Sequence, residues 1–128
     1  MIAGERRKET VKQVIERVRV ACGDTECALS VVSIVELTHG IYRAKSNADR
    51  VRRTEFVEEL TRDMIVHPLS LLIAQLAGRI EGEQAARGIS IDFADLVIGT
   101  TALHLGFDVA TINTRHFRLI PGLNVVAL

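Results

Sequence analysis

Three polar side chains, Glu36, Asp95 and Asn113, have the chemistry to bind one divalent metal ion together. Each falls at the start of a predicted helix or at the end of a predicted strand. Clustered acidic oxygens suit a hard cation such as Mg²⁺ or Mn²⁺. Such an ion promotes phosphodiester hydrolysis, because it activates water and neutralises charge on the phosphate. The three residues therefore predict a site for a hard divalent cation, provided that the fold brings them to one edge of a sheet.

The two carboxylates also have a structural interpretation. Serine followed three residues later by glutamate, as in Ser33 and Glu36, is typical of a capping box at a helix start. Asp92 suits an N-cap, and Asp95 suits the first turn, where the helix dipole favours negative charge. However, the segment after Asp95 is apolar, and a carboxylate beside it is costly unless a cation meets it. Capping and metal binding both remain open for these residues.

A second polar stretch, with Thr111, Asn113 and Arg115, follows a predicted strand. It suits either a hydrogen-bonded turn or a polar site. The four histidines share no metal-ligand spacing and are expected at the surface or at helix ends: His39, His67, His104 and His116.

The periodicity of apolar residues predicts helices that alternate with short strands. We expect helices over residues 10–21, 33–43, 48–62, 69–87 and 93–105, the last of them apolar nearly all round and therefore buried. We expect strands over residues 27–32, 64–67, 107–112 and 123–127. Short apolar strands that alternate with helices predict an α/β fold, a parallel sheet with helices on both faces. In such folds, sites gather at the carboxyl ends of the strands.

Length and composition limit the class of protein. The chain has 128 residues, which suits one domain, and its 48% hydrophobic and 25% charged residues are ordinary for a globular protein. Its 16 basic and 16 acidic residues give no net charge, which excludes nucleic-acid binding by bulk positive charge. The group Arg50, Arg52 and Arg53 is either a solvated face or lies beside an RNA path. The low aromatic content, 4%, argues against an aromatic stacking platform.

The sequence also suggests a compartment. No apolar run approaches the ~18–20 residues of a membrane span, and the first residues lack the order of a signal peptide. Cys22 and Cys27 are too few for a disulfide framework and have no nearby zinc ligands, so we expect two free thiols beside a turn. A cytoplasmic protein without membrane contact is expected.

Four stretches resemble the motifs of PIN-domain proteins of the VapC toxin type: residues 2–6, 33–40, 95–103 and 110–117. Within them, Glu36 matches the acidic residue of the second motif, Asp95 the metal-binding aspartate, and Asn113 a position that is often Asp or Asn. The resemblance covers nearly the whole chain. It implies a PIN-like three-layer α/β/α fold with a short central parallel sheet. It also implies an endoribonuclease toxin that depends on Mg²⁺ or Mn²⁺, an RNA substrate, a cognate antitoxin and a homodimer.

The resemblance also implies roles for the site residues. Glu36 and Asp95 would bind the metal, and Asn113 would orient the attacking water or a metal ligand. Thr111 and Arg115 would support the loop or touch phosphate. Independently of the resemblance, Asp92 would support the start of the helix as its N-cap.

One departure from the family pattern affects the start of the chain. The family opens with a short strand that ends in an aspartate, and this sequence begins just after that position. We therefore expect the first strand and one catalytic carboxylate to be missing, through a misassigned initiation codon or a genuine truncation. Loss of a central strand would leave backbone groups of its neighbours without partners, which is costly.

This departure leaves a second hypothesis, a catalytically impaired PIN-like binding module. Such a module would pair with an antitoxin or with an intact toxin. A non-functional fragment is a third possibility, recognisable by a non-cooperative melt. Metal-stimulated RNA cleavage by the 128-residue chain would exclude both.

Overall fold

The computed structural model describes residues 1–3 and 9–128 of the chain. Its helices are α1 (Val11–Cys22), α2 (Val31–Tyr42), α3 (Asn47–Asp63), α4 (Leu71–Ala85) and α5 (Phe93–Leu105). Its strands are β1 (Ile2–Ala3), β2 (Ala28–Ser30), β3 (Ile65–His67), β4 (Val109–Thr111) and β5 (Val125–Ala127), and a 3-10 helix spans Phe117–Leu119. Every helix and strand predicted from the sequence is present, with each end within two residues of the prediction.

Polar side chains begin the helices. At α1, the hydroxyl of Thr10 accepts a hydrogen bond from the Gln13 N–H, and the Gln13 side chain accepts one from the Thr10 N–H. The next three helices begin after serines whose hydroxyls accept an N–H of the first turn: Ser30, Ser46 and Ser70. Each such cap satisfies an N–H group that has no partner within the helix, which stabilises the fold by about 1 kcal/mol.

The strands form two parallel sheets in the described part of the chain, with the orders β1-β4-β5 and β2-β3. In the first sheet, Ala110 of β4 pairs with Ile2 on one side and with Val126 on the other. The sequence predicts one parallel sheet, whereas the described residues form two. β1 and β2 lie beside each other, but no ladder joins them, because strands of two or three residues offer few backbone groups for pairing.

The start of the chain corrects the expectation of a missing first strand. Met1 and Ile2 are buried, and the Ala110 N–H donates a hydrogen bond to the Met1 carbonyl over 2.7 Å. β4 therefore has a partner on both sides. A strand of two residues shows no alternation in the sequence, so only the pairing with β4 identifies it. Residues 4–6 of the first motif-like stretch lie outside the described residues.

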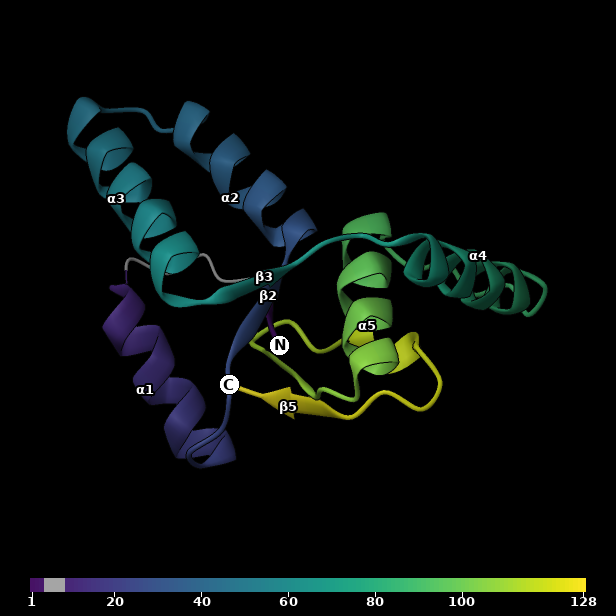
Figure 1. Ribbon diagram of the computed structural model, residues 1–128. Helices are drawn as coiled ribbons and strands as arrows, with labels where there is room; N and C mark the ends of the chain where they lie inside the picture. Colours follow the sequence, from purple (N-terminus) through teal and green to yellow (C-terminus); the bar gives the residue numbers. More distant parts are fainter. Residues whose placement is uncertain (4–8) are drawn as a thin grey trace.

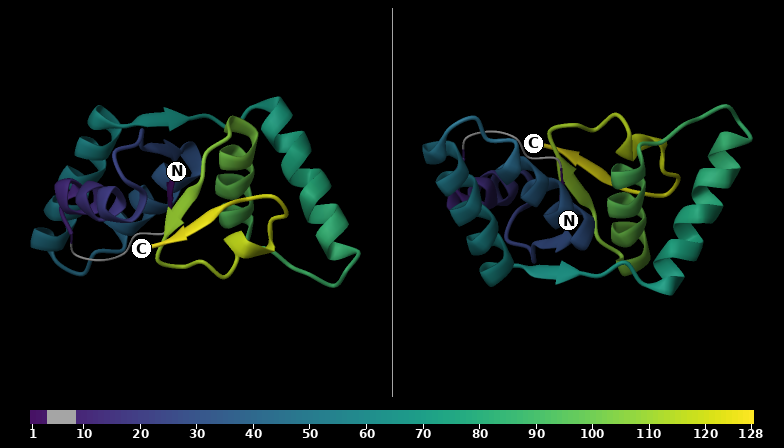
Figure 2. Two further views of the ribbon diagram at one scale, coloured as in Figure 1. Left: turned by 90° about the horizontal axis from the view of Figure 1, so that it is seen from below. Right: turned by 90° about the horizontal axis from the view of Figure 1, so that it is seen from above.

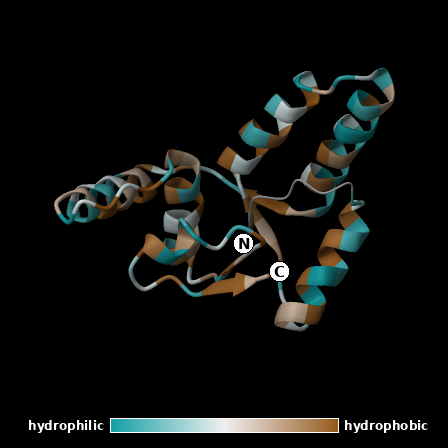
Figure 3. Cartoon of the chain, turned by 180° about the vertical axis from the view of Figure 1, so that it is seen from behind, coloured by the Kyte–Doolittle hydropathy of each residue, from teal (hydrophilic) through white to brown (hydrophobic). Residues whose placement is uncertain are grey.

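Helices cover the strands on two sides, which confirms the three-layer α/β/α prediction (Figures 1 and 2). α1, α2 and α3 lie on one side, and α4 and α5 on the other. α2 and α3 form a hairpin that extends away from the strands. Hydrophilic residues dominate the outer turns of α3 (Figure 3). Among the described residues, no helix combines the length and the apolar character that a membrane span requires.

Among the helices, α5 is the most deeply buried in the described part of the chain. Its residues from Leu96 to Ala102 are all buried. One side packs with Phe117 and β4, and the other packs with α4 and Ile120. This confirms the prediction of a buried helix over 93–105. The side chains at the start of α5 are therefore mounted on a rigid element.

Candidate functional site

Three side chains with metal-binding chemistry come together at the start of α5: Asp92, Asp95 and His116. One ligand atom from each residue lies within 4.8 Å of the other two. Asp92 is exposed, whereas Asp95 and His116 are half-buried. Two carboxylates and an imidazole at this separation can surround one small cation.

The helix α5 positions both carboxylates. Asp92 is the N-cap, and its Oδ2 accepts a hydrogen bond from the Asp95 N–H over 3.4 Å. Asp95 lies in the first turn, where the positive end of the helix dipole favours negative charge. The predicted capping arrangement is confirmed, and it directs two carboxylates to the same end of a buried helix.

The loop after β4 brings His116 to the carboxylates. Nδ1 of His116 lies 3.0 Å from Oδ2 of Asp95. The next residue, Phe117, is 1% exposed and fixes this loop against the core. The sequence prediction placed His116 with the surface histidines. Its position shortly after the strand that leads to Asn113 was the available signal, since sites gather at strand ends.

The charge of Asp95 is costly in this position. Its side chain is only 15% exposed. Burial raises the pKa of the Asp95 carboxyl, the hydrogen bond with His116 opposes this rise, and the negative charge of Asp92 adds to it. A positive charge beside Asp95 would relieve both the burial and the repulsion. The electrostatics of the site thus favour a bound cation.

Glu36 lies on α2, outside the three-residue cluster. It is half-buried and has an interaction partner. The predicted capping box is wrong by one turn, because Ser30 is the N-cap of α2 and its hydroxyl accepts the Val32 N–H over 3.2 Å. Ser33 instead lies inside the helix, and its buried hydroxyl has no hydrogen-bond partner within residues 1–3 and 9–128. Glu36 is therefore free of the capping role that the sequence suggested.

The polar stretch after β4 forms a hydrogen-bonded turn. The Asn113 N–H donates to the Thr111 hydroxyl over 3.0 Å, and that hydroxyl lies 3.4 Å from the Asn113 carbonyl, to which it donates. Thr111 is buried, whereas Asn113 and Arg115 are exposed. The buried threonine thus holds a turn that presents two polar side chains to solvent beside the loop of His116.

The donor set of the cluster fits a divalent cation. Carboxylate oxygens suit Mg²⁺ and Mn²⁺, and an imidazole is better matched to a transition metal than to Mg²⁺. The raised pKa of Asp95 is consistent with a place for positive charge. Asp92, Asp95 and His116 are therefore the residues around which a metal ion would fit.

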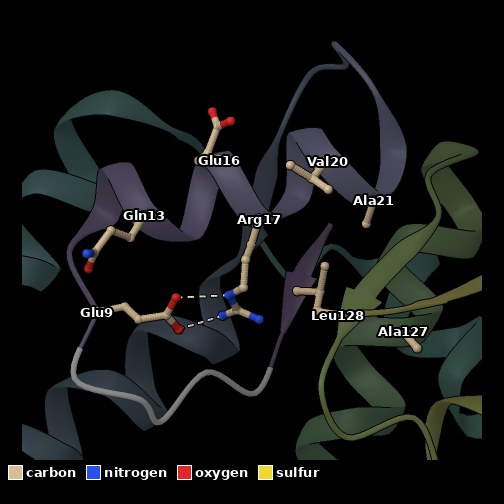
Figure 4. Close-up of a pocket in the computed structure, with 8 residues that line it drawn as sticks. All are labelled: Glu9, Gln13, Glu16, Arg17, Val20, Ala21, Ala127 and Leu128. Atoms are coloured by element: carbon tan, nitrogen blue, oxygen red, sulfur yellow. Dashed lines mark hydrogen bonds and ion pairs between the residues drawn. The ribbon is translucent and has the colours of Figure 1, made fainter.

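A separate hollow of about 590 Å³ lies between α1 and the end of β5 (Figure 4). Arg17 spans it and forms two hydrogen bonds with Glu9, of 2.9 and 2.7 Å. Val20 and Leu128 contribute apolar walls. None of the candidate site residues lines this hollow, so it has no part in the metal chemistry.

The sequence profile of the PIN domain matches residues 1–123. The chain belongs to the PIN-domain family. Ribonuclease VapC1 from Rickettsia felis is 25% identical to this PIN domain over 100 residues, which are 78% of this chain and 75% of that protein. The resemblance inferred from the sequence motifs is thereby confirmed.

Solved structures share the PIN fold of this chain. VapBC-5 from Mycobacterium tuberculosis, a member of the VapBC family of toxin-antitoxin systems, contains a chain with a TM-score of 0.71 and 24% identity, over 79% of this chain and 81% of that chain. The DNA-bound VapBC from Salmonella typhimurium contains a chain with a TM-score of 0.72 and 27% identity, over 89% and 83%.

Proposed function

We propose that this PIN domain is a metal-dependent endoribonuclease, the toxin of a type II toxin–antitoxin system, and that it hydrolyses RNA phosphodiester bonds. The observation that carries the proposal is the cluster of Asp92, Asp95 and His116 on a PIN fold. Similarity to a VapC ribonuclease supports the activity.

Each site residue has a part in this proposal. A bound Mg²⁺ or Mn²⁺ ion supplies water activation and neutralises charge on the phosphate. Asp92, Asp95 and His116 hold the metal, with Nδ1 of His116 against the Asp95 carboxylate. Glu36 on α2, outside this cluster, is the further metal ligand that the family resemblance implies. Asp92 keeps the first turn of α5 in place and adds a carboxylate.

The turn after β4 serves the substrate in this proposal. The amide of Asn113 orients the attacking water or a metal ligand, and Thr111 fixes the backbone that carries it. Arg115 is exposed and contacts the phosphate of the RNA. These residues position the reacting groups.

The partners follow from the same family. Because similar chains occur in VapBC structures, we propose a cognate antitoxin as the protein partner and a homodimer as the assembly. We propose a cytoplasmic location, where RNA substrates are available.

Cleavage of a labelled RNA by the 128-residue chain tests the proposal. We expect cleavage with Mn²⁺ or Mg²⁺, none with a chelator, and none by Asp95→Asn, whose amide has nearly the same shape and less affinity for a cation. Asp24→Asn, in an exposed loop, is the matched control and should cleave normally. Unchanged cleavage by Asp95→Asn would overturn the assignment.

One observation favours a second candidate, the catalytically impaired binding module. Glu36 is absent from the ligand cluster among the described residues, so the metal site there has fewer acidic ligands than the family resemblance implies. Co-purification with an antitoxin, together with no metal-stimulated RNA cleavage, would support this candidate. Metal-stimulated cleavage would exclude it.

A further inference from the structure

The tip of the α2–α3 hairpin concentrates positive charge. Residues 42–53, named the hairpin tip below, hold five of the 16 basic residues of the chain and one of the 16 acidic residues. The remaining chain therefore has an excess of acidic residues, although the net charge is zero. A chain with a net charge of zero therefore has a local basic surface at the hairpin tip.

Three of these cations are exposed and unpaired: Arg43, Lys45 and Arg50. None of them forms an ion pair or a side-chain hydrogen bond within residues 1–3 and 9–128. The acidic residue of the tip, Asp49, already pairs with Arg52 over 2.7 Å. Three positive charges are thus available to an external anion.

Arg53, another basic residue of the hairpin tip, joins its two helices. Nη1 of Arg53 on α3 donates a hydrogen bond to the carbonyl of Gly40 in the last turns of α2. This bond crosses the hairpin and satisfies a carbonyl near the end of α2. The exposed cations are therefore presented by two helices that are tied together.

An aromatic ring accompanies the cations. Tyr42, the only tyrosine of the chain, ends α2 and is 75% exposed. Bases of single-stranded nucleic acid stack on such rings, and this contact tolerates any base. The low aromatic content argued against a stacking platform, but one exposed ring beside Arg43 suffices for one base.

The helix α2 links the hairpin tip to the candidate site. α2 carries Glu36, and it contacts α5, the helix that carries Asp95. Arg43 is the seventh residue after Glu36, a rise of about 10 Å along the helix. Figure 1 shows α2 running from the region beside α5 to the end of the hairpin. A strand of RNA that leaves the site along α2 would reach the tip.

We propose that the hairpin tip binds single-stranded RNA beside the cleaved bond, with Arg43, Lys45 and Arg50 on phosphates and Tyr42 stacked on a base. This inference rests on the proposed ribonuclease function. Unpaired cations alone would also suit an acidic protein. The exposed ring and the direct connection to the metal-binding residues favour RNA.

RNA binding without cleavage tests this proposal. The protein is the full chain with Asp95→Asn, and the probe is a short fluorescent single-stranded RNA of mixed sequence. The test variant adds Arg43→Gln, Lys45→Gln and Arg50→Gln. The matched control adds three substitutions that remove the same charge from exposed positions on α4 and beyond: Arg79→Gln, Arg87→Gln and Arg118→Gln. Circular dichroism melts confirm that both variants fold.

We expect the tip variant to bind at least about 10-fold more weakly, and the control variant to bind normally. The slope of log K against log salt should fall by about 0.7 for each phosphate contact that is lost. Tyr42→Ala should weaken RNA binding but leave the slope of log K against log salt unchanged. Tyr42→Phe, which keeps the aromatic ring, should bind RNA as the unmodified tip does. With Asp95 intact, the tip variant should raise KM and leave kcat unchanged.

Equal binding by the tip and control variants would overturn the proposal. So would selective loss, in the tip variant, of binding to a poly-glutamate peptide while RNA binding persists, because the partner would then be an acidic protein. Failure of the proposed function has a different signature: RNA binding depends on the tip, but the unmodified chain shows no metal-stimulated cleavage.

Discussion

The start of α5 and the hairpin tip use charge in opposite ways. At the start of α5, the Asp95 side chain is 15% exposed and the charge of Asp92 lies close by. At the hairpin tip, Arg43, Lys45 and Arg50 are exposed and have no ion-pair partner within the described residues. At the start of α5, burial and the nearby charge of Asp92 disfavour the ionised form of Asp95. At the hairpin tip, the charged side chains are exposed to solvent.

This difference separates two physical tasks. A charge that is held away from water interacts strongly with a ligand, but it destabilises the ionised fold until that ligand binds. An exposed charge costs little and attracts phosphates over a distance that salt screens. A site for metal chemistry requires the first arrangement, and an RNA contact surface is served by the second.

The two regions also differ in how tightly their helices are packed. A Cβ on Gly99 of α5 would overlap Ile120 Cδ1, and it would lie 3.1 Å from Leu123 Cδ2. A Cβ on Gly40 of α2 would lie at an ordinary 3.9 Å from Arg53 Nη1. Asp95 is carried by a tightly packed helix, whereas the helix that leads to the basic surface has space around Gly40.

The largest expected effect is on catalysis. Asp95→Asn should lower metal-dependent RNA cleavage by at least about 10²-fold, as loss of a key electrostatic group commonly does. Single-turnover rates with Mn²⁺ measure it, beside Asp24→Asn. The tip variant should keep its kcat. A fall in its kcat would show that the hairpin tip, like the start of α5, acts in catalysis.

Packing predicts the next largest effect. Gly99→Ala should lower the free energy of unfolding by about 1–3 kcal/mol, because the added methyl group overpacks the core. Gly40→Ala should raise it by up to about 1 kcal/mol, since alanine favours a helix and the space is open. Urea denaturation measures both. Equal effects of the two substitutions would contradict the difference in packing.

The pH dependence of stability tests the strained carboxylate. The pKa of Asp95 is raised in the folded chain, so its contribution to stability is complete below the pKa of the unfolded chain, about 3.9, and is lost as pH rises through the folded value. Without metal, Asp95→Asn should therefore melt above the unmodified chain at pH 7. Below about pH 4 the difference should disappear.

A control distinguishes this effect from a general loss of negative charge. Asp24→Asn should show no such pH-dependent gain. An Asp95→Asn variant that melts lower than the unmodified chain at neutral pH without metal would show that the ionised carboxylate stabilises the fold.

The smallest expected effect concerns the hairpin tip. Arg43→Gln, Lys45→Gln and Arg50→Gln should each change the free energy of unfolding by no more than about 0.5 kcal/mol, because these side chains are exposed and have no ion pair with another described residue. Thermal melts measure this. A large loss of stability would mean that these cations support the fold, and RNA binding by the variants would then need to be compared at matched stability.

The elements of the fold were predictable because they depend on local patterns. Apolar spacing identifies α4 and α5, and the run of apolar residues after Asp95 marks α5 as buried. The N-cap role of Asp92 was equally visible. In contrast, the cap of α2 was predicted at Ser33 and lies at Ser30, because both serines precede apolar residues and only the position of β2 decides between them.

The site was predictable in part. Asp95 was identified from the conflict between its charge and the apolar helix that follows it. His116 was not, because its contact with Asp95 crosses 21 residues of sequence and depends on the loop that Phe117 anchors. Glu36 shares no ligand cluster with Asp95 among the described residues. The roles of Glu36 and Asn113 stay predictions.

The sequence by itself determined the helices, the main strands and the chemistry available at their ends, since periodicity and capping are properties of neighbouring residues. Tertiary structure decided which of those groups meet. It paired Ile2–Ala3 with β4, separated the strands into two sheets, and placed His116 beside Asp95. These outcomes depend on backbone hydrogen bonds and on packing between distant segments, which leave no local pattern in the sequence.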